Sequence, residues 1–174
     1  MGLVKRVNEI DGTLFGDIGL LKCDPVKIQL KENAVPYSIN TARRVPFPIL
    51  SKVKEELEYM VSVGVIEPVT EPTDWCAPMV PVVKRNGNIR ICVDLKKLNE
   101  SVRRERFILP TFDDIIPKLV GARVFSKLDA SSGFYQMPLD PESSRYTTFI
   151  TPFWAVLFPP RPIRDYISTS GVPT

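Results

Sequence analysis

Residues 79–95, MVPVVKRNGNIRICVDL, contain two runs rich in β-branched side chains, separated by Arg-Asn-Gly-Asn. Val and Ile favour strands because their branched side chains pack well on a pleated surface. Asn86 and Gly87 tolerate the positive φ angles that a tight reversal of the chain requires. The stretch therefore predicts a β-hairpin with its turn at residues 85–88.

Cations surround the turn of this predicted hairpin. Lys84 and Arg85 precede the turn and Arg90 follows it, so both strands can present positive charge to one anionic ligand. Hairpin edges also carry Lys and Arg simply as solvated side chains that prevent edge-to-edge pairing. The local sequence favours this second interpretation, and the first needs support from elsewhere in the chain.

A second basic segment follows at residues 96–107, where the cations are interleaved with apolar side chains. These cations are Lys96, Lys97, Arg103, Arg104 and Arg106. Such a surface can follow a phosphate backbone, and each cation then adds to a salt-dependent affinity for nucleic acid. A solvated helix face has the same composition and is the more common origin of such a run.

The composition of the 174 residues is that of a soluble globular domain, with 44% hydrophobic residues, 25% charged residues and a net charge of +3. The chain has no histidine, and its three cysteines are scattered without a CxxC pair. Structural zinc and histidine-based acid–base chemistry are therefore disfavoured. Neither a signal peptide nor a membrane span is visible, so we expect an intracellular protein, cytoplasmic or nuclear, without a membrane partner.

Residues 1–50 are expected to form an extended lead-in. Val26, Ile28 and Leu30 alternate with polar residues, a pattern that suits a half-buried strand. Three prolines then punctuate residues 31–50 and argue for an extended arm.

Helices are predicted on both sides of the hairpin. Residues 51–64 place apolar side chains on one face, with Ser51 as the N-cap and a glycine at the end. A second helix begins after Thr111 and ends at Gly121. Residues 123–129, RVFSKLD, then read as a buried strand.

Asp129 stands at the exit of that predicted strand, in the stretch FSKLDASSGFYQMPL (residues 125–139). A carboxylate at the end of a strand is well placed for chemistry, because the strand fixes its backbone while the side chain reaches solvent. Taken alone, such an Asp is more often a turn residue. The basic hairpin upstream and the aromatic residues after Asp129 favour a functional role instead. A carboxylate binds magnesium, cations bind a triphosphate and a flat aromatic ring packs against a sugar. These are the parts of a nucleotidyl-transfer site.

Several motifs in order make residues 64–153 resemble the fingers and first palm strands of reverse transcriptases from gypsy-type LTR retrotransposon polyproteins. They are GVIEPVTEPTDWCAPMVPVVKRNGNIRICVDLKKLN, FILPTFDDIIPKL, SKLDASSGFYQMPLD and FITPF. The resemblance implies an α+β fold, namely the fingers and incomplete palm of a right-hand polymerase with a basic β-hairpin and flanking helices. It also implies RNA-directed DNA synthesis, with Mg2+ as cofactor and with an RNA or DNA template-primer and dNTP as partners.

The resemblance assigns roles residue by residue. Asp129 matches the first metal-binding, catalytic aspartate of the palm, and the carbonyl of Ala130 would lie near the second magnesium ion. Phe134 matches the aromatic side chain that lies beneath the sugar and rejects a ribose 2′-hydroxyl. Lys84 and Arg90 match the fingers cations that hold the incoming triphosphate.

The resemblance breaks off after Phe153, where the family continues with a glycine and later with a YxDD turn that carries two more catalytic aspartates. Residues 154–174 instead read WAVLFPPRPIRDYISTSGVPT. Trp154 is encoded by TGG and the codon of Ala155 begins with G, so reading one nucleotide later gives GGG, a glycine, directly after Phe153. Permitted codons in that frame then restore the family motifs at their expected spacing. We therefore predict a partial reverse transcriptase domain at residues 51–153, followed by a frameshifted, poorly ordered tail.

Because the later catalytic aspartates are missing, the chain is expected to be inactive on its own. The alternative from another class is a non-catalytic nucleic-acid-binding module that uses the basic segments from Lys84 to Arg106. A generic globular interaction domain is the third interpretation. It gains weight only if neither nucleic-acid binding nor a hairpin is found.

Overall fold

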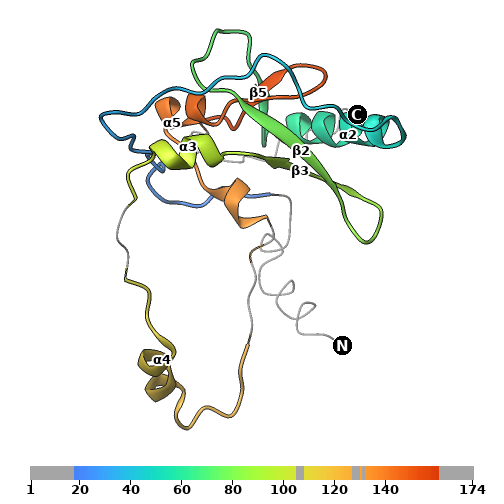
Figure 1. The fold of residues 1–174 in the computed structure, drawn as a ribbon. Helices are drawn as coiled ribbons and strands as arrows, with labels where there is room; N and C mark the ends of the chain where they lie inside the picture. Colours follow the sequence, from blue (N-terminus) through green and yellow to red (C-terminus); the bar gives the residue numbers. More distant parts are fainter. Residues whose placement is uncertain (1–17, 105–107, 127–129, 131, 161–174) are drawn as a thin grey trace, which may run out of the picture.

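The computed structural model describes residues 18–104, 108–126, 130 and 132–160. Over these residues it has a mixed α+β fold around a five-stranded sheet with the order β1-β5-β4-β2-β3 (Figure 1). The strands are β1 (Glu67–Pro68), β2 (Ala77–Val83), β3 (Ile89–Val93), β4 (Phe149–Ile150) and β5 (Ala155–Leu157). The helices are α2 (Phe47–Ser62), α3 (Lys96–Ser101), α4 (Phe112–Leu119), the 3-10 helix η1 (Gly133–Gln136) and α5 (Pro141–Tyr146). No helix in these ranges has the length and apolar content needed to cross a bilayer.

The predicted hairpin is confirmed as strands β2 and β3, which pair antiparallel. Gly87 has φ +80° in the turn, a conformation that costs a residue with a side chain about 1–2 kcal/mol. The main-chain N–H of Asn88 donates to the Asn86 Oδ1 atom over 3.1 Å. Local turn chemistry therefore decides where the chain reverses.

Helix α2 begins earlier than the sequence predicts. It starts at Phe47, directly after Pro46, so the prediction that Ser51 is its N-cap is wrong. Prolines at the start explain the difference, because proline has the φ angle of the first helical turn and that turn needs no N–H donor. The apolar stripe of the helix is buried as predicted. Gly64, with φ +68°, follows its end.

The core lies where α2 packs against the sheet (Figure 1). Val53 and Leu57 of α2, Phe149 of β4 and Val156 of β5 are all completely buried. Burying an apolar side chain of this size contributes about 1.5–3 kcal/mol. The core thus holds the base of the hairpin, while its turn extends beyond the helix.

The lead-in runs as an extended arm over residues 18–46 (Figure 1). Val26, Ile28 and Leu30 are half-buried and alternate with exposed residues, which confirms the predicted alternation. They do not form a continuous strand. Val26 makes an isolated parallel bridge with Leu139 instead.

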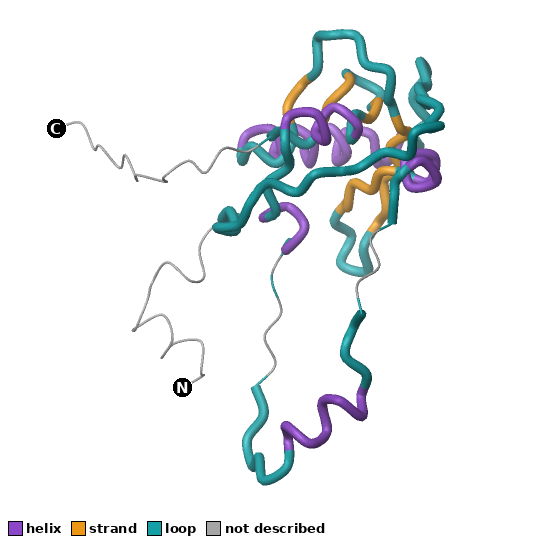
Figure 2. Tube along the Cα trace, turned by 90° about the vertical axis from the view of Figure 1, so that its left-hand side faces the viewer, coloured by secondary structure: helices purple, strands orange, loops and turns teal. Residues whose placement is uncertain are grey.

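Helix α4 is capped as predicted but is not packed. Thr111 and Asp114 form a reciprocal capping box, in which the Thr111 N–H donates to Asp114 Oδ2 over 2.8 Å. No side chain of the helix is buried. Both views show it apart from the sheet (Figures 1 and 2).

The segment after α4 differs from the prediction of a buried strand. Residues 123–126 are irregular, and Val124 and Phe125 are 85% and 67% exposed. An apolar run becomes a buried strand only where a neighbouring strand can pair with it, and the sheet described above offers none here. The prediction is therefore wrong for these four residues, and residues 127–129 lie outside the described ranges.

Residues 154–160 continue the fold. Strand β5 pairs antiparallel with β4 on one side and with β1 on the other. The prediction of a poorly ordered tail is therefore wrong for residues 154–160, while residues 161–174 lie outside the described ranges. The Ala-Val-Leu run of β5 supplies main-chain hydrogen-bonding groups to its neighbouring strands, and its apolar side chains are covered by the core.

Candidate functional site

Phe134 is carried by the short helix η1, and its ring is 90% exposed. Ser132, directly before this helix, has the left-handed φ of 54° that turns the chain. A Cβ atom at Gly133 would lie 3.2 Å from the Cβ of exposed Ala130, which is closer than ordinary contact. The small residues before Phe134 therefore permit a tight turn that leaves the ring accessible.

Tyr135 anchors the Phe134 turn to the core. Its ring stacks on Phe158, with 6.0 Å between the ring centroids. Phe158 lies in turn 5.6 Å from Phe149, measured between ring centroids. Neighbouring aromatic rings therefore have opposite roles, one held in the protein and the other presented to solvent.

Lys84 and Arg90, both predicted to hold the triphosphate, lie on one face of the hairpin. Arg90 is paired with Val82, and the Lys84 N–H donates to the Asn88 carbonyl over 2.8 Å. Since side chains alternate between faces along a strand, this register makes the two cations diagonal neighbours. Both are exposed, and neither forms an ion pair with another described residue.

The Tyr135 hydroxyl, next to Phe134 in the chain, has a raised pKa. Burial raises the pKa of the Tyr135 hydroxyl, negative charge at Cys92 and Glu56 raises it further, and the Arg90 guanidinium opposes the rise. The effect of Arg90 is the smallest of the four, and burial of the hydroxyl dominates.

Asp129, the predicted catalytic and metal-binding residue, lies outside the described residues, so its position stays a prediction. Magnesium takes about six oxygen ligands in near-octahedral geometry. The described part of the chain contains no group of three or more His, Cys, Asp or Glu side chains that could hold a metal ion. These residues, Ala130 included, do not form the predicted magnesium site by themselves.

The contribution of the lead-in was missed from the sequence. The Leu21 N–H donates to the Gln136 carbonyl and the Val26 N–H donates to the Pro138 carbonyl, each over 2.8 Å. These bonds hold the segment directly after Phe134. The apolar alternation of the lead-in indicated partial burial, but main-chain pairing leaves no side-chain signature that names its partner.

Asp140 links the same segment to helix α5. Its carboxylate accepts hydrogen bonds from the N–H groups of Glu142 and Ser143, over 3.0 and 3.2 Å, and from the Ser143 hydroxyl. The Ser143 Oγ atom also accepts from the Ile28 N–H over 2.7 Å. The hydrogen bond from the Ser143 side chain is the main cause that lowers the Asp140 pKa. Lead-in, turn and helix are thus one hydrogen-bonded unit.

The cations of the second basic segment are exposed wherever they are described. Its described cations are Lys96, Lys97, Arg103 and Arg104. Lys97 forms an exposed ion pair with Glu100 at 3.0 Å, an interaction of little energetic weight. Arg106 lies outside the described residues. Buried Leu98 fixes helix α3 to the body and so positions the first two cations.

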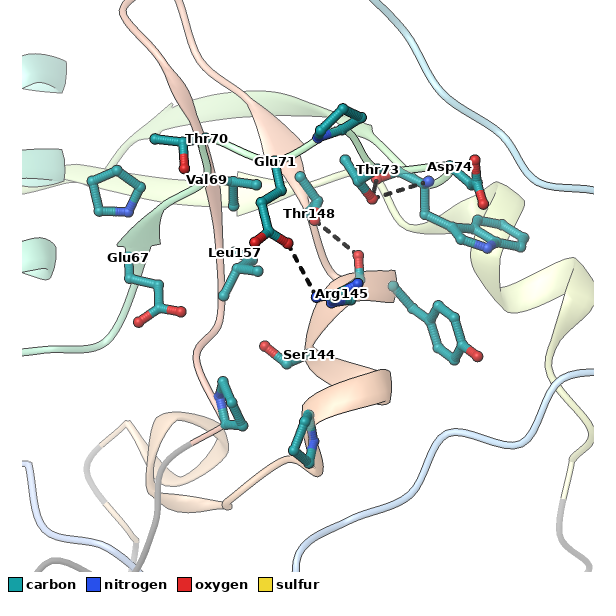
Figure 3. Close-up of a pocket in the computed structure, with 16 residues that line it drawn as sticks. Glu67, Val69, Thr70, Glu71, Thr73, Asp74, Ser144, Arg145, Thr148 and Leu157 are labelled. Atoms are coloured by element: carbon teal, nitrogen blue, oxygen red, sulfur yellow. Dashed lines mark hydrogen bonds and ion pairs between the residues drawn. The ribbon is translucent and has the colours of Figure 1, made fainter.

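A separate groove of about 430 Å³ lies between residues 67–75 and helix α5 (Figure 3). Glu71 and Arg145 form an ion pair of 3.1 Å in it, and both side chains are well exposed. The hydrogen bond that Tyr146 donates to Glu142 raises the pKa of Tyr146 to about 12. None of the site residues predicted from the sequence lines this groove.

Three curated relatives illustrate what the chain is similar to. An uncharacterized protein of Caenorhabditis elegans is 36% identical over 83% of this chain and 11% of its own length. A putative enzymatic polyprotein of Cassava vein mosaic virus is 30% identical over 85% of this chain and 24% of its own length. The retrovirus-related Pol polyprotein from transposon 297 of Drosophila melanogaster is 29% identical over 68% and 12%, respectively. The chain spans about a tenth to a quarter of the length of these relatives.

Solved structures confirm the predicted α+β polymerase fold. The native protease-reverse transcriptase of prototype foamy virus matches with a TM-score of 0.73 and 18% identity, over 92% of this chain and 22% of that chain. The foamy viral protease-reverse transcriptase in complex with dsDNA matches with a TM-score of 0.63 and 17% identity, over 86% and 30%. At this level of identity the likeness concerns the fold alone.

The profile of the family described as reverse transcriptase (RNA-dependent DNA polymerase) matches residues 82–173. This range includes both hairpin cations, Asp129 and Phe134. It also continues beyond Phe153, so the expectation that nothing after this residue matches is wrong. With more than half of its length inside the match, the chain belongs to the reverse transcriptase family, whose activity is RNA-directed DNA synthesis.

Proposed function

We propose that this chain supplies the nucleotide-binding part of the fingers and palm of a gypsy-type retrotransposon reverse transcriptase. The observation that carries the proposal is the register of the hairpin, which puts Lys84 and Arg90 on one exposed face. The exposed ring of Phe134 is the third proposed contact. Two cations and one accessible ring suit a deoxynucleoside triphosphate.

Each proposed contact has a physical reason. An Arg guanidinium and a Lys ammonium make charge-assisted hydrogen bonds to phosphate oxygens, and these bonds are about twice as strong as neutral ones. The Phe134 ring offers a flat surface to the sugar and leaves no space for a 2′-hydroxyl in contact with it. Selection of dNTP over rNTP then follows from shape at the ring, while affinity follows from charge at the hairpin.

Magnesium chemistry completes this proposal. The family is generally dependent on divalent metal ions, which stabilise the attacking and leaving oxygens of phosphoryl transfer. We assign Asp129 and the Ala130 carbonyl as ligands in a longer chain that contributes further carboxylates. Residues 1–174 alone are therefore expected to show no primer extension. Magnesium-dependent DNA synthesis by these residues would contradict this part of the proposal.

Nucleotide affinity tests the hairpin assignment directly. A fluorescent deoxynucleoside triphosphate is titrated with residues 1–174, and its anisotropy reports binding. Lys84→Gln and Arg90→Gln should each weaken binding by roughly tenfold to a hundredfold, because a hydrogen bond to a charged group contributes about 1.5–3 kcal/mol. Lys118→Gln is the matched control, since this exposed cation lies on α4, apart from the hairpin. An equal loss in all three variants would refute specific triphosphate contacts.

A second candidate function is nucleic-acid binding without catalysis, favoured by the exposed cations on and after α3. An RNA or DNA template-primer is the expected ligand in both functions. Neutralising Lys96 should lower the salt dependence of its affinity by about one unit of the logarithmic slope. Template-primer binding with no measurable dNTP binding would favour this second function over the first.

A further inference from the structure

We propose that this chain binds a small, uncharged aromatic molecule in a cavity of about 250 Å³ behind the Phe134 turn. Four segments distant in sequence form its walls. They are the lead-in at Val26, the turn after α2 at Val65, the η1 turn with its continuation to Leu139, and residues 158–159. The cavity is thus built by the tertiary fold and belongs to none of the predicted nucleotide contacts except the ring of Phe134.

The chemistry of the walls selects an uncharged ligand. Among the described residues that line the cavity, none is Asp, Glu, Lys or Arg, and the Tyr135 hydroxyl is the one polar side-chain group. A water molecule needs about two to four polar partners to be held in a cavity. The cavity is half open to solvent and its described walls supply few such partners, so an apolar ligand displaces water at little cost and gains transfer free energy over the part of its surface that the walls cover.

The size and shape of the walls select an aromatic ligand. A dry apolar cavity of about 150 Å³ is known to hold one benzene ring. The larger volume here accommodates a two-ring molecule such as indole. Tyr135 and Phe158 stack with 23° between their ring planes, and rings so arranged offer edges and faces to a third ring.

Phe134 connects this cavity to the nucleotide site. Its ring lines the cavity and yet is 90% exposed, so it can shift position without disturbing the core. A ligand in the cavity contacts this ring and changes the position it offers to a sugar. Because coupling between two binding sites is reciprocal, dNTP and the aromatic ligand then change each other's affinity. This consequence rests on the proposed function, whereas binding of the aromatic ligand does not.

Ligand titration followed by NMR tests the proposal on residues 1–174, with indole as the probe. Indole should produce saturable shifts in the wild-type protein. Val26→Phe places a phenyl group in the cavity and should weaken indole binding by roughly tenfold or more. Ile116→Ser on α4 is the control, because it reduces the exposed apolar surface away from the cavity and should leave the affinity unchanged.

A second filling variant, Val65→Phe, acts from another wall and covers the case in which Val26→Phe fails to fold. Indole-3-acetate tests the charge requirement, and it should bind more weakly than indole. Absence of saturable binding, unchanged affinity in the folded filling variants, or a matching loss in Ile116→Ser would overturn the proposal. Equal affinity for indole-3-acetate would overturn the uncharged class. A dNTP titration with no effect on indole affinity would refute only the coupling to the nucleotide site.

Discussion

The hairpin of β2 and β3 and the excursion around α4, described over residues 108–126, show how far local sequence signals determine structure. Both have a clear signal, the Asn-Gly turn in one and the Thr111 capping box in the other, and both local elements form. Both also contain a glycine with positive φ, Gly87 and Gly121. They differ in burial, because the hairpin packs against α2 whereas no side chain of α4 is buried. Local chemistry decides whether an element forms, and tertiary partners decide whether its apolar face leaves water.

Because it is not packed against the body, the excursion exposes large apolar side chains to solvent. Ile108, Phe112, Val120 and Phe125 are between 67% and 92% exposed. Large apolar side chains exposed in such number mark an interaction site or a tendency to aggregate. Mutations in the excursion should therefore change association and solubility, while mutations in the body should change the free energy of unfolding.

The largest expected effect comes from replacing one phenylalanine in each region and comparing the loss in the free energy of unfolding. Phe149→Ala removes a completely buried ring and should lower the free energy of unfolding by about 3–5 kcal/mol. Phe125→Ala removes a ring that is 67% exposed and should change it by less than about 0.5 kcal/mol. Urea unfolding followed by tryptophan fluorescence measures both. Similar losses in the two variants would show that the excursion is packed in solution.

Glycine replacement gives the next largest contrast. Gly87 and Gly121 have φ values of +80° and +84°, and a Cβ atom at either position would meet open space. Gly87→Ala should cost about 1–2 kcal/mol in global stability, because the strained turn belongs to the cooperative core. Gly121→Ala should leave the urea midpoint unchanged and only loosen the end of α4. If Gly121→Ala costs as much as Gly87→Ala, the excursion unfolds together with the body.

Acid titration compares a capping carboxylate in each region. Asp140→Ala should cost about 1 kcal/mol at pH 7, the usual value of an N-cap. The pKa of Asp140 is lowered from 3.8 in the folded state, so its contribution is present above pH 3.8 and is lost as the pH falls through the lower folded pKa. Urea midpoints of wild type and variant should therefore converge in acid. The Asp114 pKa is also lowered, yet Asp114→Ala should leave the midpoints unchanged because α4 is outside the core.

Much of the fold could be predicted because its signals are local. The Asn-Gly turn, the apolar stripe of α2 and the cap of α4 each depend on residues within a few positions of one another. The prediction of a strand at residues 123–126 was wrong for the opposite reason. Its apolar side chains gave a valid local signal, but a strand also needs a neighbour, which a short window of sequence does not reveal.

For the candidate site, too, the residues could be predicted from the sequence but their long-range contacts could not. Lys84, Arg90 and Phe134 were found by family resemblance, and the structure brings the hairpin cations onto one face. The main-chain bonds from Leu21 and Val26 to the segment after Phe134 were not predictable, because a peptide N–H is present at almost every residue. The roles of these side chains stay proposals until nucleotide binding is measured.

Residues 154–160 have a good local signal. They form β5 and part of the core, and the family match runs through them in the reading frame of this chain, which weighs against the predicted frameshift just before Trp154. The Trp154 indole N–H is buried without a hydrogen-bond partner among the described residues. Natural proteins seldom retain such a group, because leaving it unpaired costs about 1–3 kcal/mol. The nucleotide sequence of the locus tests the predicted frameshift.

The smallest expected effect follows from that unpaired donor. Trp154→Phe removes the N–H while keeping a ring that can remain near Phe153, now 5.5 Å away between centroids. The free energy of unfolding should stay equal or rise by up to about 1 kcal/mol, because the relieved desolvation cost offsets the smaller apolar surface. Phe153→Leu is the matched control, since it shrinks the same ring pair without removing a donor and should be destabilising. Thermal unfolding followed by circular dichroism measures both. A clear destabilisation by Trp154→Phe would mean that the indole N–H has a hydrogen-bond partner in solution.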